Sequence, residues 1–546
     1  MRFLFFCLMV LPGFLPAQSK RKIRKMEAQA TQALVSRLQA HVRYLASDSL
    51  EGRRSGTAGE RLAMQYIEQE YREIGLTPAG NNGYEQAFPI DEGRSYQRSS
   101  FKVGDQVLAP ETDYIPLSFS AQQQAAGTAA MVMSEPGQPW FMDVKDSLEA
   151  NHNNPHFDIL ANLREAAIRS AAKGATALLL YNSSTLVDNI AFNKFDTAAP
   201  ASIPVLYITR KAMRQYFADN TASYDLQIRL VFDPHTRIAH NLAAWIDNGA
   251  ATTVILGAHY DHLGYGEDHT ALDTGHQIHN GADDNASGTA ALLELARMLK
   301  KQSPAHNNYL ILHFSGEEQG LLGSKYWLAH PARKINPNYM INMDMVGRYD
   351  TSRTLTLGGF GTAPQWARLL QADPGPLKIH TDSAGSGPSD HASFYMQEIP
   401  VLFLFTGSHS DYHKATDDWD KVNYPGMAAI VKTVYHWLGT ADTLGVFRFQ
   451  KTANPVAEER RSFTVSLGVM PDYSYSGEGM RIDGISPGKL AEKIGLQAGD
   501  IVVQLGEYRF QDIRSYMKAL GHFKKGDATT VLIRRGKEEK LFHLVF

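Results

Sequence analysis

Short apolar runs alternate with segments of helical spacing in the middle of the chain. Three runs, Thr252–Leu256, Tyr309–Phe314 and Tyr339–Met343, have the length and composition of buried strands. Between the first two, Asn285–Leu299 carries apolar side chains at helical intervals. Strands that alternate with helices build a mostly parallel sheet. The pattern therefore predicts an α/β fold with a mostly parallel, mixed sheet that is flanked by helices.

Two amphipathic helices are predicted before this region, at Ala28–Leu45 and Gly59–Ile74. The second begins with Thr57-Ala-Gly-Glu60, which has the pattern of a capping box. In such a box the Thr57 side chain accepts from a free amide while Glu60 reaches back to the start of the helix. Gly75 is suited to end this helix.

From about Phe101 the pattern changes to strand-like pieces around one helix, Leu163–Lys173. The strand-like pieces are Thr128–Ser134, Ala177–Tyr181 and Ile203–Ile208. They predict an inserted β-rich domain over residues 101–234, so that the main α/β domain is discontinuous, 18–100 and 235–446. Many short β-runs and one helix, Ser515–Leu520, predict a further β domain over residues 460–546.

The composition is that of a folded protein with several domains. The chain has 546 residues, 43% of them hydrophobic and 20% charged, and about three domains are expected at this length. The formal net charge is −3. Because no basic run dominates a folded segment, nucleic acid is not an expected partner.

The first residues have the features of a secretory signal. A positive charge at Arg2 precedes an apolar run, and the small residue Ala17 precedes Gln18. We therefore expect residues 1–17 to be removed and the protein to be secreted or periplasmic, with no transmembrane anchor afterwards. The alternative, a membrane anchor, is disfavoured because the run is shorter than the ~20 residues that a span needs. Removal would take away Cys7, the one cysteine, so neither a disulfide nor a cysteine nucleophile is expected.

Polar side chains with metal-binding or proton-transfer chemistry follow the predicted strands where each strand ends. The candidates are His259, Asp261, Asp284, Glu317, Glu318, Asp344 and, from a later loop, His413. Because ligands of a parallel sheet gather beyond the carboxyl ends of its strands, we expect these side chains to converge.

This set of residues suits a pair of divalent cations. Two cations about 3.5–4 Å apart need a bridging carboxylate, and each needs further nitrogen and oxygen ligands. Three carboxylates bound to two divalent cations would leave one net positive charge, which a bridging hydroxide would cancel. Such a hydroxide can form near neutral pH, because zinc lowers the pKa of bound water to about 7. Glu317, which is next to a candidate ligand, is suited to take the proton of that water. Asp261 can accept from the other ring nitrogen of His259 and fix its tautomer.

Other interpretations of the same residues remain open. Asp283 and Asp284 could simply cap the following helix, and the pair Glu317–Glu318 could be a solvated surface. The loop from Asn151 to His156 is more typical of a surface than of a metal site. Rival ligands in the same stretch as His259 are His262, His269, His276 and His279. Five candidate ligands at successive strand ends favour the metal site.

In combination, five motifs resemble the consecutive signatures of the secreted di-zinc aminopeptidases. They are Gly257-Ala-His259-Tyr-Asp261, Gly281-Ala-Asp-Asp284-Asn-Ala-Ser-Gly288, Glu317-Glu318-Gln-Gly, Asn342-Met-Asp344 and Ser389-Asp-His391. The resemblance covers Thr252 to about His413 and the helices before the insert.

The resemblance implies a catalytic zinc peptidase domain with two zinc ions. One ion would be held by His259, Asp284 and Asp344. The other would be held by Asp284, Glu318 and His413, with Glu317 as the general base.

The flanking domains carry resemblances of their own. The insert resembles a protease-associated domain through Arg164–Asn182 and Ile203–Ile208. The last block is similar to a PDZ domain, which implies a loop for protein C-termini at Ser466-Leu467-Gly468-Val469.

The chain also departs from the family. Some members have a disulfide-bounded tyrosine loop where this chain has Ala384-Gly-Ser-Gly-Pro388. Tyr412 could supply an oxyanion-stabilising hydroxyl instead, or could serve packing alone.

These features together predict an exported zinc aminopeptidase that removes N-terminal residues from peptides. The rival functions are cyclotransfer of N-terminal glutamine on one zinc, as in the glutaminyl cyclases, and non-catalytic peptide binding through the last block.

Overall fold

The computed structural model describes most of the chain and divides it into two compact units. The described residues are 17–152, 157–188, 190–196, 198–268, 270–273, 275–350, 352, 354–452, 465–471, 478–485, 489–510, 513–536 and 538–546. One unit comprises Met1–Phe88 and Ile238–Phe546, and the other comprises Pro89–Arg237. The predicted signal segment lies outside the described residues except for Ala17. Among the helices that the structure describes, none combines the length and the apolar character needed to cross a membrane.

A mixed sheet forms the centre of the first unit, as predicted. Its strand order is β1-β11-β13-β12-β14-β17-β15-β16, and β2 also pairs with β11. The four neighbours β13, β12, β14 and β17 run parallel. β11 is antiparallel to β1 and β13, whereas β15 is antiparallel to β17 and parallel to β16. The bounds are β1 Thr77–Pro78, β2 Glu85–Ser95, β11 Asp233–Ile246, β12 Thr252–His259, β13 Asn307–Phe314, β14 Pro337–Met343, β15 Leu355–Gly358, β16 Ile379–Thr381 and β17 Val401–Phe405.

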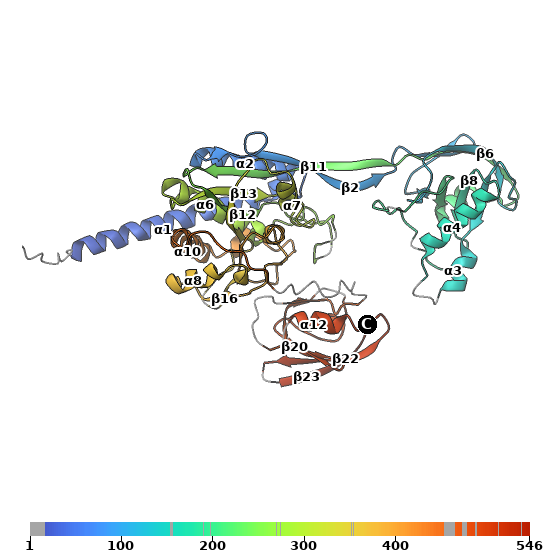
Figure 1. Cartoon of the computed structure of the whole chain (residues 1–546). Coiled ribbons are helices and arrows are strands. Elements are labelled where there is room, and N and C mark those ends of the chain that lie inside the picture. The colour runs from blue at the N-terminus through green and yellow to red at the C-terminus, as the bar shows by residue number, and fades with distance from the viewer. Residues whose placement is uncertain are drawn as a thin grey trace, which may run out of the picture. The chain divides into compact units, whose positions relative to one another are not determined.

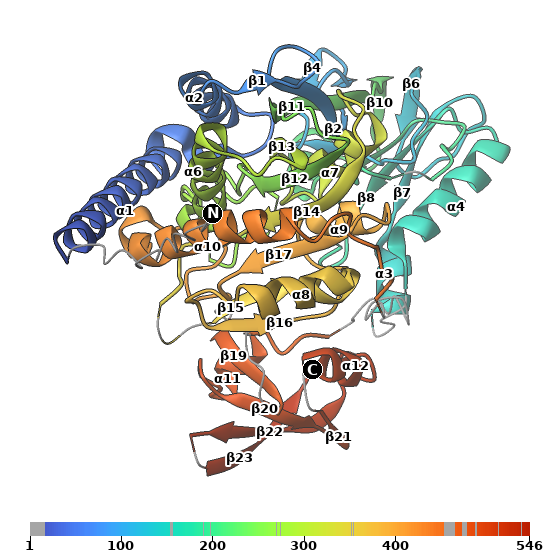
Figure 2. The same cartoon turned by 60° about the vertical axis from the view of Figure 1, so that its left-hand side comes forward.

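Helices cover both faces of this sheet, which explains why its central strands are mostly apolar and buried along nearly their whole length (Figure 1, Figure 2). In β13, Tyr309 and Ile311 enter the core shared with the longer helices, whereas Leu310 and Leu312 enter a second core on the opposite face. The first core contains α1 Ala17–Leu45, α2 Ala58–Ile74, α6 Gly288–Lys301, α8 Pro364–Ala372 and α10 Tyr424–Asp442. The second contains α7 Leu322–Ala329 and α9 His391–Tyr395. Short turns of helix are η1 Asp48–Arg53, η2 Ala282–Ser287, η3 Phe360–Thr362 and η4 Trp419–Lys421.

The helix predicted from Asn285 begins three residues later, at Gly288. The preceding turn η2 has non-helical dihedral angles at Asp284 and Asn285, and the peptide bond between them is cis. The side chain of Asn285 donates to the carbonyl of Met343 (3.0 Å) and accepts from the amide of Gly288 (2.8 Å). Neither Asp283 nor Asp284 caps α6, whose N-cap residue is Ser287 without a side-chain cap bond. The capping interpretation of this acidic pair is therefore wrong.

Only half of the predicted capping box at α2 forms. The Thr57 hydroxyl oxygen accepts from the amide of Glu60 (3.4 Å). The Glu60 carboxylate does not reach back. It accepts from the amide of His240 in β11 (3.0 Å) and from the Tyr260 hydroxyl (3.3 Å). Glu60 therefore connects α2 to β11 and to the residue that follows β12.

The second unit contains two four-stranded sheets, β4-β3-β10-β6 and β5-β9-β8-β7. Its bounds are β3 Ser100–Val103, β4 Gln106–Leu108, β5 Tyr114–Pro116, β6 Gln124–Ala130, β7 Pro139–Asp143, β8 Ala177–Tyr181, β9 Val205–Ile208, β10 Ser223–Arg229, α3 Lys145–Asn151, α4 Ile159–Ala172 and α5 Arg210–Tyr216. The strand predicted at Thr128–Ser134 lies earlier in the chain, because the pairing of β6 with β10 ends at Ala130.

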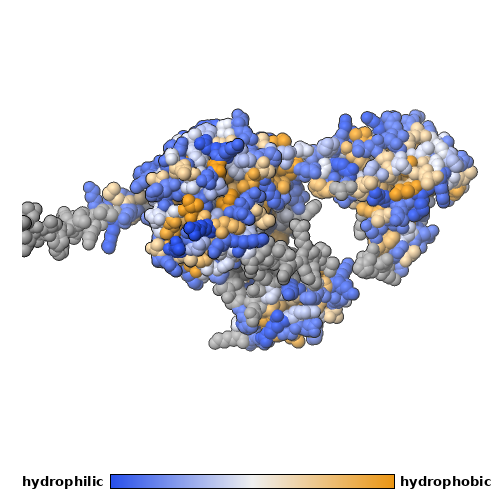
Figure 3. Space-filling model, in the orientation of Figure 1, coloured by the Kyte–Doolittle hydropathy of each residue, from blue (hydrophilic) through white to orange (hydrophobic). Residues whose placement is uncertain are grey.

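The C-terminal part of the chain has a sheet and a hydrophobic core of its own, in the order β18-β19-β20-β22-β23 with β21 beside β20. The bounds are β18 Val469–Pro471, β19 Met480–Ile485, β20 Ile501–Leu505, β21 Tyr508–Arg509, β22 Ala528–Arg535, β23 Glu538–Val545, α11 Leu490–Lys493 and α12 Ile513–Leu520. On the face shown in Figure 3, hydrophobic and hydrophilic residues are interspersed over the described surface.

A buried carboxylate joins α1 to α6. Glu294 accepts from Arg37 at 2.7 and 2.8 Å, and one of its oxygens lies 3.3 Å from Nε2 of His41. Burial raises the pKa of Glu294, but the hydrogen bonds from His41 and Arg37 outweigh it and lower the pKa to about 2.

Replacing Glu294 by Gln should lower the free energy of unfolding at pH 7 by roughly 1.5–3 kcal/mol, the range for a hydrogen bond to a charged group. The folded pKa of about 2 lies below the ordinary value of 4.5. The contribution is therefore full above that ordinary value and is lost as the pH falls towards 2. Denaturant unfolding of the wild type and of Glu294→Gln between pH 2 and 7 measures their difference in free energy of unfolding, which should become smaller as the pH falls. Glu27→Gln, an exposed change on α1, is the control, and a pH-independent difference would contradict the assignment.

Candidate metal centre

The predicted site residues lie together at the carboxyl ends of the parallel strands. His259 is the last residue of β12, Asp344 follows β14 directly, and Glu317 and Glu318 follow the end of β13. Asp284 lies in η2, before α6, and His413 lies in the loop after β17. The parallel order β13-β12-β14-β17 brings these segments to one edge of the sheet.

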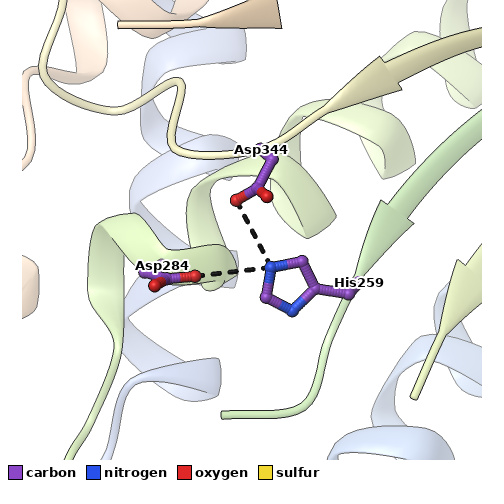
Figure 4. A group of neighbouring side chains, drawn as sticks. All are labelled: His259, Asp284 and Asp344. Carbon is purple, nitrogen blue, oxygen red and sulfur yellow. Dashed lines mark hydrogen bonds and ion pairs between the residues drawn. The ribbon is translucent and has the colours of Figure 1, made fainter. Parts of the chain in front are cut away.

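The first group of ligand atoms surrounds one imidazole nitrogen. Nε2 of His259 lies 3.3 Å from Oδ1 of Asp284 and 3.3 Å from Oδ1 of Asp344. Figure 4 shows both carboxylates pointing to this nitrogen, from the turn before α6 and from the segment after β14. All three residues are buried and could together hold a metal ion.

The second group uses the other oxygen of Asp284. Oδ2 of Asp284 lies 3.3 Å from Nε2 of His413, which is itself 3.2 Å from Oε2 of Glu318. The two oxygens of one carboxylate therefore face two different imidazoles, as a bridging ligand requires.

The separations between these atoms fit zinc. Ligand atoms at 2.0–2.2 Å from a tetrahedral zinc ion lie about 3.3–3.6 Å from one another. The four separations between a histidine nitrogen and a carboxylate oxygen in the two groups are 3.2 to 3.3 Å, at the short end of this range. Imidazole nitrogen and carboxylate oxygen are also the donors that zinc prefers. The donor set supports the predicted cofactor, two zinc ions.

The charges of the cluster favour bound cations, because four carboxyl groups with little exposure to solvent lie close together: Asp284, Glu317, Glu318 and Asp344. Burial raises the pKa of Glu317, the nearby charge of His259 lowers it, and Glu318 and Asp344 raise it further, so it lies well above its ordinary value. Burial lowers the pKa of His259, but the charges of Asp344 and Glu317 outweigh it and hold that pKa well above its ordinary value.

Main-chain carbonyls orient both histidines. Nδ1 of His413 is 3.1 Å from the carbonyl of Thr270, and Nδ1 of His259 is 3.2 Å from that of Asp261. Each Nδ1–H can donate to its carbonyl, which leaves Nε2 free to bind a metal. The carboxylate Oδ1 of Asp261, the predicted acceptor, lies farther from Nδ1 of His259, at 3.6 Å.

The Asp261 carboxylate has nearer partners around Glu317. It accepts from the Ser55 hydroxyl (2.8 Å) and from the amide of Glu317 (3.3 Å). The Ser55 hydroxyl oxygen in turn accepts from the amide of Gly316 (3.0 Å). Asp261 thus positions the main chain on which Glu317 stands.

Two supporting residues were not found from the sequence. Oδ2 of Asp417 accepts from the amides of Asp283 (2.9 Å) and Asp284 (3.1 Å), and so holds the backbone of the shared ligand. Arg53 is buried and donates to the carbonyls of Leu45, Tyr260 (2.8 Å), Asn280 (2.6 Å) and Gly281 (3.0 Å). Neither residue belongs to a motif, and Arg53 stands in a stretch that is typical of a surface loop.

The rival histidines have different surroundings. His262 lies against Glu318, and it forms a further candidate group with Asp284 and Glu318. His279 pairs with Asp273 (2.7 Å), and the ring of His276 stacks on Tyr265. His269 and His156 lie outside the described residues.

The substrate-side prediction concerns Tyr412, whose ring stacks on His413 with centroids 3.9 Å apart. Burial, then the charges of Asp284 and Glu318, raise the pKa of Tyr412 well above its ordinary value, so its hydroxyl stays protonated.

The Ser389-Asp-His391 motif contacts the strand ends: Asn342 in β14 donates to the Ser389 hydroxyl oxygen (2.9 Å).

Known proteins resemble the part of the chain that holds this site. Residues 241–438 match the model of Peptidase family M28. An aminopeptidase of Pseudomonas aeruginosa is 27% identical over 275 residues, 45% of this chain and 46% of the relative. The uncharacterized protein YfbL of Escherichia coli is 28% identical over 216 residues, 33% of this chain and 64% of the relative. The chain thus spans about half to two thirds of these relatives. These matches support a peptidase.

One solved structure that aligns with this chain is a zinc aminopeptidase from Bacillus subtilis. The identity is 18%, the TM-score is 0.41, and the alignment covers 77% of this chain and 96% of the other.

Replacing Asp284 by Asn should lower the zinc content from two ions per chain to less than one, because both ligand groups lose their shared charged oxygens. Glu318→Gln should keep the first ion, since that residue belongs only to the second group. Elemental analysis after dialysis measures both. Asp442→Asn, a buried aspartate that binds His306 and Asn307, should keep two ions. Two ions retained by Asp284→Asn would contradict the shared ligand.

Proposed function

We propose that this chain is an exported metallo-exopeptidase that hydrolyses N-terminal residues from peptides. The observation that carries the proposal is the position of Asp284, whose two oxygens lie in two ligand groups beside Glu317. The Peptidase family M28 match of residues 241–438 supports the same class of reaction. Export rests on the signal-like residues 1–17.

The ligands are assigned to two zinc ions, one on His259, Asp284 and Asp344, the other on Asp284, Glu318 and His413. Such ions, when bound, polarise the scissile carbonyl and lower the pKa of water. The remaining residues are assigned to handling the substrate and its protons. The carboxylates around the site favour a free N-terminal ammonium, which would select the terminus of a peptide over its interior.

Glu317 is the proposed general base. It takes the proton from the attacking water and gives it to the leaving amine, so one carboxylate serves both steps. Its place depends on main-chain bonds to Asp261 and Ser55 that leave the Glu317 side chain free. Asp261 therefore acts by positioning this base. Tyr412, stacked on His413, is the candidate donor to the oxyanion.

Replacing Glu317 by Gln should preserve two zinc ions and lower kcat for aminoacyl-nitroanilide cleavage about 10²–10⁴-fold, because the isosteric amide cannot take a proton. Metal analysis and steady-state kinetics on the same preparations measure the two effects. Retained turnover would remove Glu317 from this role.

The cyclase alternative is tested on the wild-type protein. A peptide with N-terminal glutamine should release free glutamine and no ammonia, whereas cyclotransfer would release ammonia without glutamine. Two complete ligand groups favour hydrolysis, since the rival reaction uses one zinc.

The flanking domains keep their predicted assignments. The insert, residues 101–234, is proposed as protease-associated-like and residues 460–546 as PDZ-like. In the proposed peptide loop, Leu467 is buried and its carbonyl accepts from the amide of Ala491 (2.7 Å). Gly468 has a φ of 77° and donates its amide to the Ser466 hydroxyl oxygen (3.0 Å), while Val469 begins β18.

A PDZ-like block should bind peptide C-termini by adding a strand beside β18. A labelled peptide with a free carboxylate should bind the full-length Glu317→Gln protein equally well before and after zinc removal. The same peptide with an amidated C-terminus is the matched control and should bind more weakly. Fluorescence anisotropy measures both, and zinc-dependent or terminus-independent binding would contradict the assignment.

A further inference from the structure

His262 is a buried histidine at the metal centre that the proposed reaction does not use. It follows Asp261, and its Nδ1 lies 2.7 Å from Oε1 of Glu318. The other oxygen of Glu318, Oε2, faces His413 at 3.2 Å. The two oxygens of Glu318 are therefore divided between two histidines.

The distances separate a hydrogen bond from shared metal binding. The separation of 2.7 Å is that of a short hydrogen bond to a charged acceptor. It is clearly smaller than the 3.2–3.3 Å between the atoms of the two ligand groups. The separation of His413 from Glu318 is thus compatible with binding one ion, whereas that of His262 is too short for two ligands and fits a hydrogen bond.

The proton of the His262 ring belongs on Nδ1. Nε2 is buried and has no hydrogen-bond partner among the described residues. A proton on Nε2 would leave a buried donor unpaired and would turn the lone pair of Nδ1 towards a carboxylate. With the proton on Nδ1, the ring donates to Glu318.

The surrounding backbone limits the positions that this ring can take. The amide of His262 donates to the carbonyl of Arg53 (3.3 Å). The ring lies against Gly281, where a Cβ would come within 2.4 Å of Cδ2 of His262 and where φ is 54°. The ring meets that of His413 edge-on, with centroids 5.8 Å apart.

We propose that His262 is a positioning residue for the second metal group, not a ligand in it. Its hydrogen bond occupies Oε1 of Glu318, which makes Glu318 a ligand through Oε2 alone. A carboxylate that binds through one oxygen takes one coordination position, so positions remain for water and substrate. This inference rests on the proposed two-zinc site and adds to it how the second site stays open.

The number of imidazoles bound per zinc ion tests the proposal directly. X-ray absorption of the fully loaded wild-type protein should give one imidazole per zinc on average, His259 on one ion and His413 on the other. Three imidazoles over two ions would make His262 a ligand and overturn the proposal.

A pair of variants tests the hydrogen bond. His262→Ala should weaken binding of the second zinc ion about 10–100-fold, the usual effect of losing a partner of a ligand, and leave the first unchanged. His262→Asn should restore most of the affinity, because the amide nitrogen of Asn can take the place of Nδ1–H. Competition with a chromophoric chelator measures both affinities without substrate. Equal loss in both variants, or no loss in His262→Ala, would overturn the proposal.

The matched control is another buried histidine that lies against a buried glutamate. His41→Ala removes one partner of Glu294, away from the metal centre, and should leave both zinc affinities unchanged. The outcomes also separate this proposal from the proposed function. Wild-type protein that binds two zinc ions with one imidazole each, yet cleaves no N-terminal residue, would refute the peptidase and leave the role of His262 standing.

Discussion

The site depends on one carboxylate that serves two histidines at once. Asp284 can do so because its backbone leaves the helical path before α6 begins. The Asp417 carboxylate accepts a hydrogen bond from the amide of Asp284, and the side chain of Asn285 donates one to the carbonyl at the end of β14. A regular helix that started at Asn285 would make Asp284 its N-cap residue and would turn the carboxylate towards the free amides of the first turn. The irregular turn is therefore the structural condition for a shared ligand.

Burying several carboxylates together is costly, and the chain places cationic groups near them without pairing each one. Arg53 donates to main-chain carbonyls, so its charge is held near Asp261 and Asp284 while their oxygens remain available. Burial, opposed by the charges of Asp261 and Asp284, lowers the pKa of Arg53 to about 10, so it remains charged at neutral pH. The uncompensated charge at the centre then favours divalent cations.

The sequence predicted the features that have strong local signals. β12, β13 and β14 are apolar runs, and the residues at their ends follow from the geometry of parallel sheets. Side chains whose role depends on distant backbone were not predictable. In the sequence Arg53 has the surroundings of a polar loop. In the structure it is buried and donates to main-chain carbonyls more than 200 positions away. Whether His262 or His413 is the ligand depends on differences of about 0.5 Å, which spacing along a chain does not encode.

The hydrogen bonds of Arg53 also bear on how much of the chain is needed to build the centre. The family match begins at residue 241, after the second unit, yet the carbonyls of Tyr260, Asn280 and Gly281 all accept from an arginine that lies before that unit. The helices on either side of this arginine also share the main core with α6 and α10. A recombinant fragment cut at the family boundary would lose the donor for three buried acceptors and part of its core. The smallest autonomous fragment that builds this metal centre must therefore be assembled from two stretches of the gene.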